Sequence, residues 1–105
     1  MPDQPIYHDL PEIVDTVEEY LSRPPMFRVI LHNDDYTTMQ FVIMVLEKVF
    51  RRTAAEATQI MLQVHHRGSG ECGVYPYEIA ETRVAQVKQL AEDNGFPLLC
   101  TIEEA

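Results

Sequence analysis

The residues best suited to chemistry are a polar run, Asn33-Asp34-Asp35, and a distant histidine, His65. Asn and Asp are frequent in turns, so a structural role is the ordinary interpretation of the run. Its oxygens could instead accept hydrogen bonds from a cation if the turn lay beside a pocket. In a two-layer fold the turn after the first strand lies near the following helices, so residues 33–42 and 61–65 could form one small pocket.

Catalysis and metal binding find little support in the sequence. It contains no nucleophile motif, phosphate-binding loop or dinucleotide fingerprint, and neither cysteine has an obvious basic activator. His65 and His66 are adjacent, so on a helix they would point about 100° apart and could not both face one ion. Zinc sites need a different spacing of histidines or cysteines. We therefore expect no enzymatic activity, no metal site and no cofactor.

The overall charge limits the classes of partner. The chain has 105 residues and a net charge of −9, from 17 acidic and 8 basic residues. This charge repels phosphate backbones and suits cationic ligands, so we expect no nucleic-acid partner. No stretch has the roughly 18 apolar residues of a membrane helix, and no signal peptide is visible, which predicts a cytoplasmic protein without a membrane partner. Cys72 and Cys100 lie in apolar runs and are expected to be buried thiols.

The chain divides near residue 25. Residues 1–25 hold five of its seven prolines, at positions 2, 5, 11, 24 and 25. Ile13, Val14, Val17 and Leu21 recur there at helical spacing, which permits either a short docked helix or a mobile tail. Isolated helices of this length are marginal in water, so we favour the tail. The expected organisation is a flexible extension, 1–25, and a core domain, 26–105.

The core domain has an alternation of helical and strand patterns. A strand from Met26 precedes the polar run, and a capping box at Thr37–Gln40 predicts a helix from about Thr38. A second capping box, Thr53–Glu56, opens a helix that Gly68 would end. A short strand over 72–75, a helix over 77–93 and a strand over 98–102 follow, and the inward positions of that helix are Ile79, Ala80, Val84, Val87 and Leu90. This order, β-α-α-β-α-β, predicts an α+β fold, a two-layer sandwich of a small, mainly antiparallel three-stranded sheet and three helices.

Seven segments in this order resemble one known family. Residues 26–105 resemble ClpS, the bacterial adaptor that delivers N-degron substrates, proteins recognised by their first residue, to the ClpAP protease. The resemblance implies the fold predicted above, a monomer without catalytic activity or cofactor, and binding of proteins that begin with Leu, Phe, Tyr or Trp. The segments are Phe27-Arg28-Val29-Ile30-Leu31, Asn33-Asp34-Asp35-Tyr36-Thr37, Met39-Gln40-Phe41-Val42, Met61-Leu62-Gln63-Val64-His65, Cys72-Gly73-Val74-Tyr75, Ala80-Glu81-Thr82 and Pro97-Leu98-Leu99-Cys100-Thr101.

The resemblance also implies site residues. Asn33, Asp34 and His65 would hold the α-amino group of the substrate. A second set would form or border the pocket for the first side chain: Ile30, Asp35, Thr37, Thr38, Met39, Val42, Met61, Val64 and Leu98. A third set would contact the N-terminal domain of the ClpA unfoldase: Tyr36, Glu78, Glu81 and Arg83. The extension would engage the unfoldase during hand-off.

One position departs from the family. Many relatives have proline where this chain has Thr38, which we take as the first residue of the helix, a place where proline is favoured and not required. We expect a slightly looser pocket rim and the same function. A rival hypothesis from another class is a protein-docking modulator that alters the protease without binding N-termini.

Overall fold

The structure is a computed structural model that describes residues 24–105. Its elements follow the predicted order, and they are β1 (Met26–His32), α2 (Met39–Lys48), α3 (Ala54–Arg67), β2 (Ser69–Pro76), α4 (Tyr77–Asp93) and β3 (Leu99–Glu104). The fold class is therefore confirmed. The choice between tail and docked helix for residues 1–25 lies outside the described residues, apart from Pro24 and Pro25. Within residues 24–105, no helix is long and apolar enough to cross a membrane.

The sheet has three antiparallel strands in the order β2-β1-β3. The central strand, β1, pairs Val29 with Gly73 on one side and with Ile102 on the other. Because side chains alternate along a strand, Val29 and Leu31 face the helices, where both are fully buried. Arg28 and Ile30 face the opposite side of the sheet, and Arg28 donates a 2.9 Å hydrogen bond to Glu103 there.

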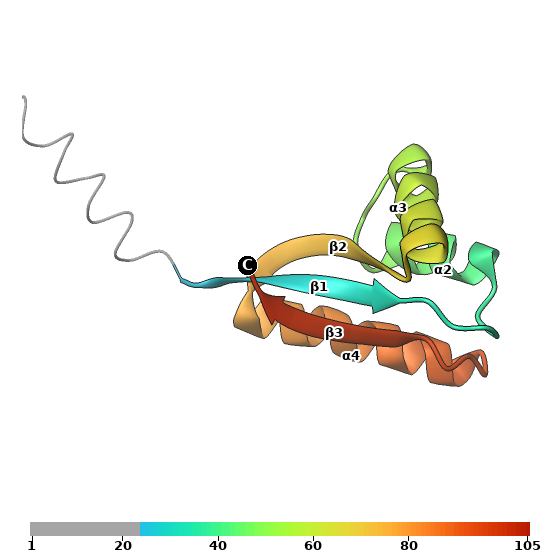
Figure 1. The fold of residues 1–105 in the computed structure, drawn as a ribbon. Coiled ribbons are helices and arrows are strands. Elements are labelled where there is room, and N and C mark those ends of the chain that lie inside the picture. The colour runs from blue at the N-terminus through green and yellow to red at the C-terminus, as the bar shows by residue number, and fades with distance from the viewer. Residues whose placement is uncertain (1–23) are drawn as a thin grey trace, which may run out of the picture.

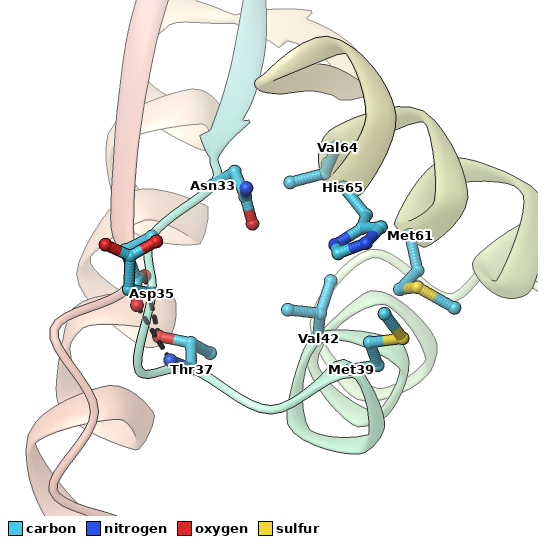
Figure 2. Close-up of a pocket in the computed structure, with 9 residues that line it drawn as sticks. Asn33, Asp35, Thr37, Met39, Val42, Met61, Val64 and His65 are labelled. Carbon is cyan, nitrogen blue, oxygen red and sulfur yellow. Dashed lines mark hydrogen bonds between the residues drawn. The ribbon is translucent and has the colours of Figure 1, made fainter.

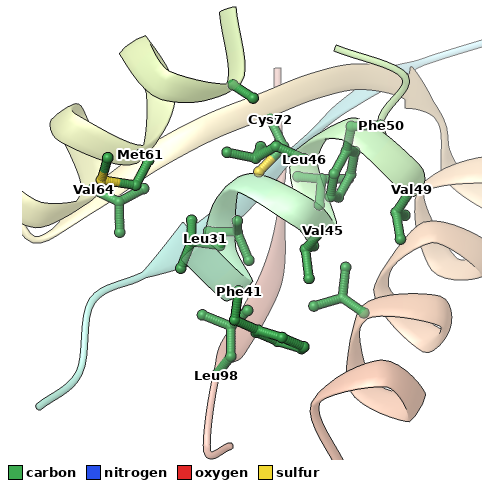
Figure 3. Packing of buried hydrophobic residues seen from close by; sticks show 14 of the residues in the cluster. Leu31, Phe41, Val45, Leu46, Val49, Phe50, Met61, Val64, Cys72 and Leu98 are labelled. Carbon is green, nitrogen blue, oxygen red and sulfur yellow. The ribbon is translucent and has the colours of Figure 1, made fainter. Parts of the chain in front are cut away.

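The helices are divided between two places. Figure 1 shows α4 running along the sheet, while α2 and α3 pack together near the end of β1. A single core joins them, as Figure 3 shows for the contacts among Leu31, Phe41, Leu46 and Leu98. The end of β1 and the beginnings of the next elements are therefore held against buried apolar side chains, which fixes the position of the loop between β1 and α2.

The start of α2 differs from the prediction. Thr38 is the N-cap, and its Oγ1 accepts a 3.1 Å hydrogen bond from the backbone N–H of Phe41. The predicted capping box of Thr37 and Gln40 is wrong, because Thr37 donates its backbone N–H and its hydroxyl to Asp34 instead. Thr38 is also not the first helical residue. Its φ of −74° lies in the range that proline adopts, so the backbone at this position is compatible with proline.

Both ends of α3 form as predicted. Thr53 accepts from the N–H of Glu56 at 3.1 Å, and Glu56 accepts from the N–H of Thr53 at 3.0 Å, which completes the capping box. Gly68 ends the helix in the left-handed region, with φ of 90°. A residue with a side chain would be strained there, so the glycine is required by the backbone.

Other sequence predictions need smaller corrections. Ile79 is 43% exposed and does not point inward. The helical periodicity places Ala80 and Val87, seven residues apart, on the buried side of α4 instead. The strand predicted over 72–75 is longer, and begins at Ser69. The last strand begins at Leu99 and extends to Glu104, two residues beyond the predicted end.

The cysteines are free thiols, as expected. Cys72 is fully buried, and Cys100 is partly buried. Burial raises the pKa of Cys72, and the nearby Cys100 raises it further. Burial likewise raises the pKa of Cys100, to about 12. Both thiols therefore stay protonated at neutral pH and behave as small apolar side chains.

Candidate binding site

Three segments converge on a pocket at the end of the sheet. The loop after β1, the first turn of α2 and the last turns of α3 surround a volume of about 250 Å³ (Figure 2). The structure thus brings together the two segments that the sequence predicted to meet, 33–42 and 61–65. The lining residues are Asn33, Asp34, Asp35, Thr37, Met39, Val42, Met61, Val64 and His65.

The inner wall of the pocket is apolar. Val42, Met61 and Val64 are all buried, with exposed fractions of 6%, 7% and 2%. Met39 lies at the mouth and is 44% exposed. Methionine side chains are unbranched and polarisable, so Met39 and Met61 can adjust to ligands of different shape.

Two polar side chains face each other across the pocket. Figure 2 shows the Asn33 amide extending from the end of β1 toward the imidazole of His65 on α3. The backbone N–H of Asn33 donates a 2.9 Å hydrogen bond to the carbonyl of Gly68, which follows α3. This bond joins the strand end to the helix end and fixes the separation of the two side chains.

Close packing of α3 on β2 supports the same arrangement. A Cβ at Gly70 would lie 2.9 Å from Cγ2 of Val64, closer than real Cβ contacts. Gly70 therefore lets the strand approach the helix at the residue that lines the pocket wall. Gly68 and Gly70 have different roles, since the first needs an unusual φ and the second needs space.

Asp34 is held by its own loop. Its Oδ1 accepts from the backbone N–H groups of Tyr36 and Thr37, at 2.8 and 2.7 Å, and its Oδ2 accepts from the Thr37 hydroxyl at 2.7 Å. Partial burial acts to raise the pKa of Asp34, but the hydrogen bonds from Thr37 and Tyr36 together outweigh it and lower the pKa. Asp34 is therefore an anion at neutral pH that also shapes the turn.

Asp35 lines the same pocket but has different surroundings. It is exposed, and its carboxylate forms no hydrogen bond with any other residue in the part of the chain that the structure describes. All of its acceptor capacity therefore remains for a ligand or solvent. These two neighbouring carboxylates cannot be distinguished from the sequence, because the difference arises from which of them folds back on the turn.

Three residues predicted to form or border the pocket do not line it. Ile30 is buried on the side of the sheet away from the helices, and Thr38 caps α2. Leu98 is 7% exposed and packs in the core beside Phe41 (Figure 3). The nine residues that do line the pocket were all predicted, so no lining residue was missed.

The histidine pair behaves as expected from its position on α3. The rings of His65 and His66 meet edge to face, with centroids 5.1 Å apart. His65 lines the pocket, while His66 borders a groove on the outer side of the helix. Among residues 24–105, no cluster of three or more His, Cys, Asp or Glu could hold a metal ion.

The four predicted unfoldase contacts do not form one cluster. Glu78 and Glu81 are exposed near the start of α4, which follows the end of β2 that pairs with Met26. Tyr36 is 76% exposed and follows the other end of β1. The length of β1, roughly 20 Å for a strand of this size, separates the two places. Arg83 stacks over the Tyr75 ring, with Cζ 5.8 Å from its centroid.

Comparison with known proteins assigns the family. Residues 22–101 match the family model described as ATP-dependent Clp protease adaptor protein ClpS. The chain belongs to the ClpS family. The ClpS of Shewanella piezotolerans is 54% identical over 97 residues, which cover 92% of this chain and 95% of that protein. The ClpS of Nitratidesulfovibrio vulgaris is 60% identical over 88 residues, which cover 84% of this chain and 88% of that protein.

A solved structure of a ClpS protein has the same fold. It is Agrobacterium tumefaciens ClpS2 bound to L-phenylalaninamide, with 38% sequence identity and a TM-score of 0.76. The match covers 79% of this chain and all of that one. This ClpS-family chain is thus an adaptor of the ATP-dependent Clp protease, from a family of adaptors and not of known enzymes.

Proposed function

We propose that this chain binds the free N-terminal residue of N-degron substrates, with preference for Leu, Phe, Tyr and Trp, and delivers them to the ClpA unfoldase for degradation by ClpP. The observation that carries the proposal is the pocket itself, which joins an apolar interior to a polar mouth. Its volume of about 250 Å³ is below the roughly 300–1,000 Å³ of ordinary small-molecule sites and suits one amino-acid side chain.

The ligand of the related structure has the chemistry that such a pocket would recognise. L-phenylalaninamide carries a free α-amino group, a benzyl side chain and an amide in place of the next peptide bond. It therefore represents the first residue of a protein that begins with phenylalanine. In the present chain the benzyl group would enter the apolar interior, and the amine would remain at the polar mouth.

The amine would be held by acceptors from both sides of the pocket. An α-amino group has a pKa of roughly 7.7–8.0, so at neutral pH it is mostly an ammonium with three donors. Asn33 offers its amide oxygen, and His65 offers a ring nitrogen when the imidazole is neutral. Asp34 contributes negative charge and orients the loop, whereas the Asp35 carboxylate has free acceptor capacity. Charge-assisted hydrogen bonds contribute roughly 1.5–3 kcal/mol each.

The side chain would add a similar contribution. Burial of a Leu or Phe side chain is worth about 1.5–3 kcal/mol. After the cost of association, the sum is compatible with micromolar binding, on the order of −8 kcal/mol. Met39 and Met61 can fit Leu or an aromatic ring, whereas a narrow entrance disfavours branching at Cβ. Peptides that begin with Ile or Val should therefore bind more weakly than those that begin with Leu.

Delivery can be tested with a reporter protein that begins with Leu. Purified ClpA and ClpP should degrade it faster when this chain is present, and an otherwise identical reporter that begins with Ile should gain much less. The Asn33→Ala chain should lose the acceleration. If both reporters were accelerated equally, the chain would not select substrates by their first residue.

The protein-docking modulator makes a different prediction for the same variant. If the chain acted only by docking, Asn33→Ala would change ClpA activity as the unaltered chain does. A variant that still binds ClpA, yet no longer accelerates degradation of the Leu reporter, supports the adaptor function and excludes the modulator. Binding to ClpA is measured separately. A variant that has failed to fold is then recognised because it loses both ClpA binding and the acceleration of degradation.

A further inference from the structure

A concentration of positive charge lies between α2 and α4, away from the pocket. Lys48, Arg51 and Arg83 line a groove of about 360 Å³, and none of the described residues that line it is acidic. The chain has 8 basic residues against 17 acidic ones, so three of its few cations gather at one place. The remaining lining residues are Val49, Gln86, Gln89 and Leu90.

These cations are not neutralised within the described residues. The ion pairs among residues 24–105 all involve Arg28, which pairs with Glu71 and Glu103. Within the same residues, none of the three groove cations forms an ion pair. Arg83 donates from Nη1 to Gln86 at 3.2 Å, but its Nε is shielded from solvent and has no acceptor in this part of the chain. The groove therefore offers charge, amide groups and an apolar floor to an acidic segment.

The chain itself contains a segment of matching chemistry. Residues 1–22 include no Lys or Arg, and their acids are Asp3, Asp9, Glu12, Asp15, Glu18 and Glu19. Apolar residues recur among these acids, at Ile13, Val14, Val17 and Leu21. Such a segment can present carboxylates to the three cations and apolar side chains to the partly buried Leu90.

The described chain begins at the side of the molecule where the groove lies. Phe27 pairs with Tyr75 across the sheet, and Arg83 stacks over the same Tyr75 ring at 5.8 Å. Six residues, 20–25, lie between Glu19 and Met26. An extended chain spans about 3.3–3.6 Å per residue, so these six can cover some 20 Å. The acids nearest to the core can therefore reach the groove without unfolding it.

We infer that the acidic segment 1–22 docks through its carboxylates on the basic groove formed by Lys48, Arg51 and Arg83. Arg83 also belongs to the predicted unfoldase contacts, so the docked segment would lie on part of that proposed surface. The contact is electrostatic at an exposed site, so salt weakens it.

A spin label in the segment tests the contact in the full chain. Thr16→Cys provides a reactive thiol, and the buried Cys72 and the partly buried Cys100, whose pKa values are raised by burial, should react far more slowly. We expect strong loss of NMR amide intensity at Lys48, Arg51 and Gln86, and little at Gln63 on the outer side of α3. Raising NaCl from about 0.05 to 0.5 M should restore the lost intensity. Equal loss at Gln63 and in the groove would overturn the proposal.

Charge variants provide the matched comparison. Reversal of the exposed groove cations, Lys48→Glu with Arg51→Glu, should abolish the intensity loss, whereas Arg67→Glu on α3 should leave it unchanged. A second measurement needs no label: Glu18→Gln with Glu19→Gln should shift the same groove amides in a ¹⁵N spectrum of the chain. Loss of intensity that survives the groove reversal, or spectra that do not differ at the groove, would show that the segment does not dock there.

Discussion

Asp34 and Asp35 are neighbours in the sequence and have different surroundings in the structure. Asp34 accepts three hydrogen bonds from Tyr36 and Thr37, whereas Asp35 accepts none from the described residues. The Asp34 carboxylate therefore stabilises the loop, whereas the Asp35 carboxylate keeps its acceptor capacity. This difference between the two carboxylates bears on which of them would act in the proposed acceptor set.

The first prediction concerns Asp34 and stability. Its pKa is lowered in the folded state, so its stabilising effect is present above the ordinary carboxyl pKa and is lost as pH falls through the lowered value. Asp34→Ala should cost roughly 1 kcal/mol of unfolding free energy at neutral pH, the scale of the lost hydrogen bonds. In urea titrations the difference from the unaltered chain should shrink as pH falls below the ordinary carboxyl range, because the native carboxyl then becomes protonated and its hydrogen bonds lose their charge. A difference that stays constant with pH would contradict this role.

The second prediction concerns His65 and ligand binding. A neutral ring nitrogen of His65 would accept a hydrogen bond from the ammonium, so His65→Ala should weaken binding of a Leu peptide by at least about tenfold, the scale of one charge-assisted hydrogen bond. His65→Gln keeps an acceptor and should retain part of the affinity. His66→Ala is the matched control, because His66 does not line the pocket, and it should leave the affinity unchanged. If His65→Ala binds the peptide as tightly as the control in fluorescence anisotropy, His65 is not the acceptor.

At the scale of elements, the site depends on where strands and helices end. The C-cap of α3 at Gly68 supplies the carbonyl that accepts from Asn33, so one backbone geometry positions residues on both sides of the pocket. The N-cap of α2 at Thr38 sets the direction in which Met39 and Val42 enter the pocket wall. Changes at these ends should therefore affect binding as well as stability.

Two glycines make this a testable third prediction. Gly68 and Gly95 both have positive φ, 90° and 73°, and a Cβ at either would meet no atom within 4 Å. Alanine at either position should therefore cost about 1 kcal/mol through backbone strain alone. Only Gly68→Ala should also weaken peptide binding, because Gly95 lies after α4 and away from the pocket. Equal affinities in the two variants would show that the Gly68 carbonyl does not position the site.

Sequence patterns predicted the elements better than their ends. The Thr53–Glu56 box and Gly68 were identified correctly, because these signals depend on neighbours in the chain. The cap of α2 was placed one residue early, because Thr37 and Thr38 are equivalent in sequence and the choice between them depends on Asp34. Leu98 is apolar and follows the last helix, and nothing local shows that it packs beside Phe41 and not in the pocket.

At the scale of the whole molecule, one apolar core holds the three segments of the site together. It includes Leu31 before the loop, Val45 and Leu46 on α2, and Cys72 on β2, all fully buried. The pocket wall residues Val42 and Val64 belong to the same core. The site is therefore largely formed before a ligand binds, which reduces the entropy that binding must overcome.

The thiols report on this core and give a fourth prediction. Because burial raises the pKa of Cys72 and Cys100, a thiol reagent at about pH 8 should react slowly with the folded chain and rapidly with both thiols in denaturant. The rate in increasing urea should follow unfolding measured by circular dichroism. Rapid reaction of Cys72 without denaturant would indicate that the core opens more readily than its packing implies.

The central claim is that the pocket recognises a free N-terminal amine, and acetylation of that amine in a peptide tests it most directly. Fluorescence anisotropy should be measured with two peptides that share a sequence beginning with Leu, one with a free amine and one acetylated. Acetylation removes the ammonium and leaves the side chain unchanged, so we predict binding of the free peptide and a loss of at least about a hundredfold, roughly 2.7 kcal/mol, for the acetylated one. Equal affinity for the two peptides would contradict the account.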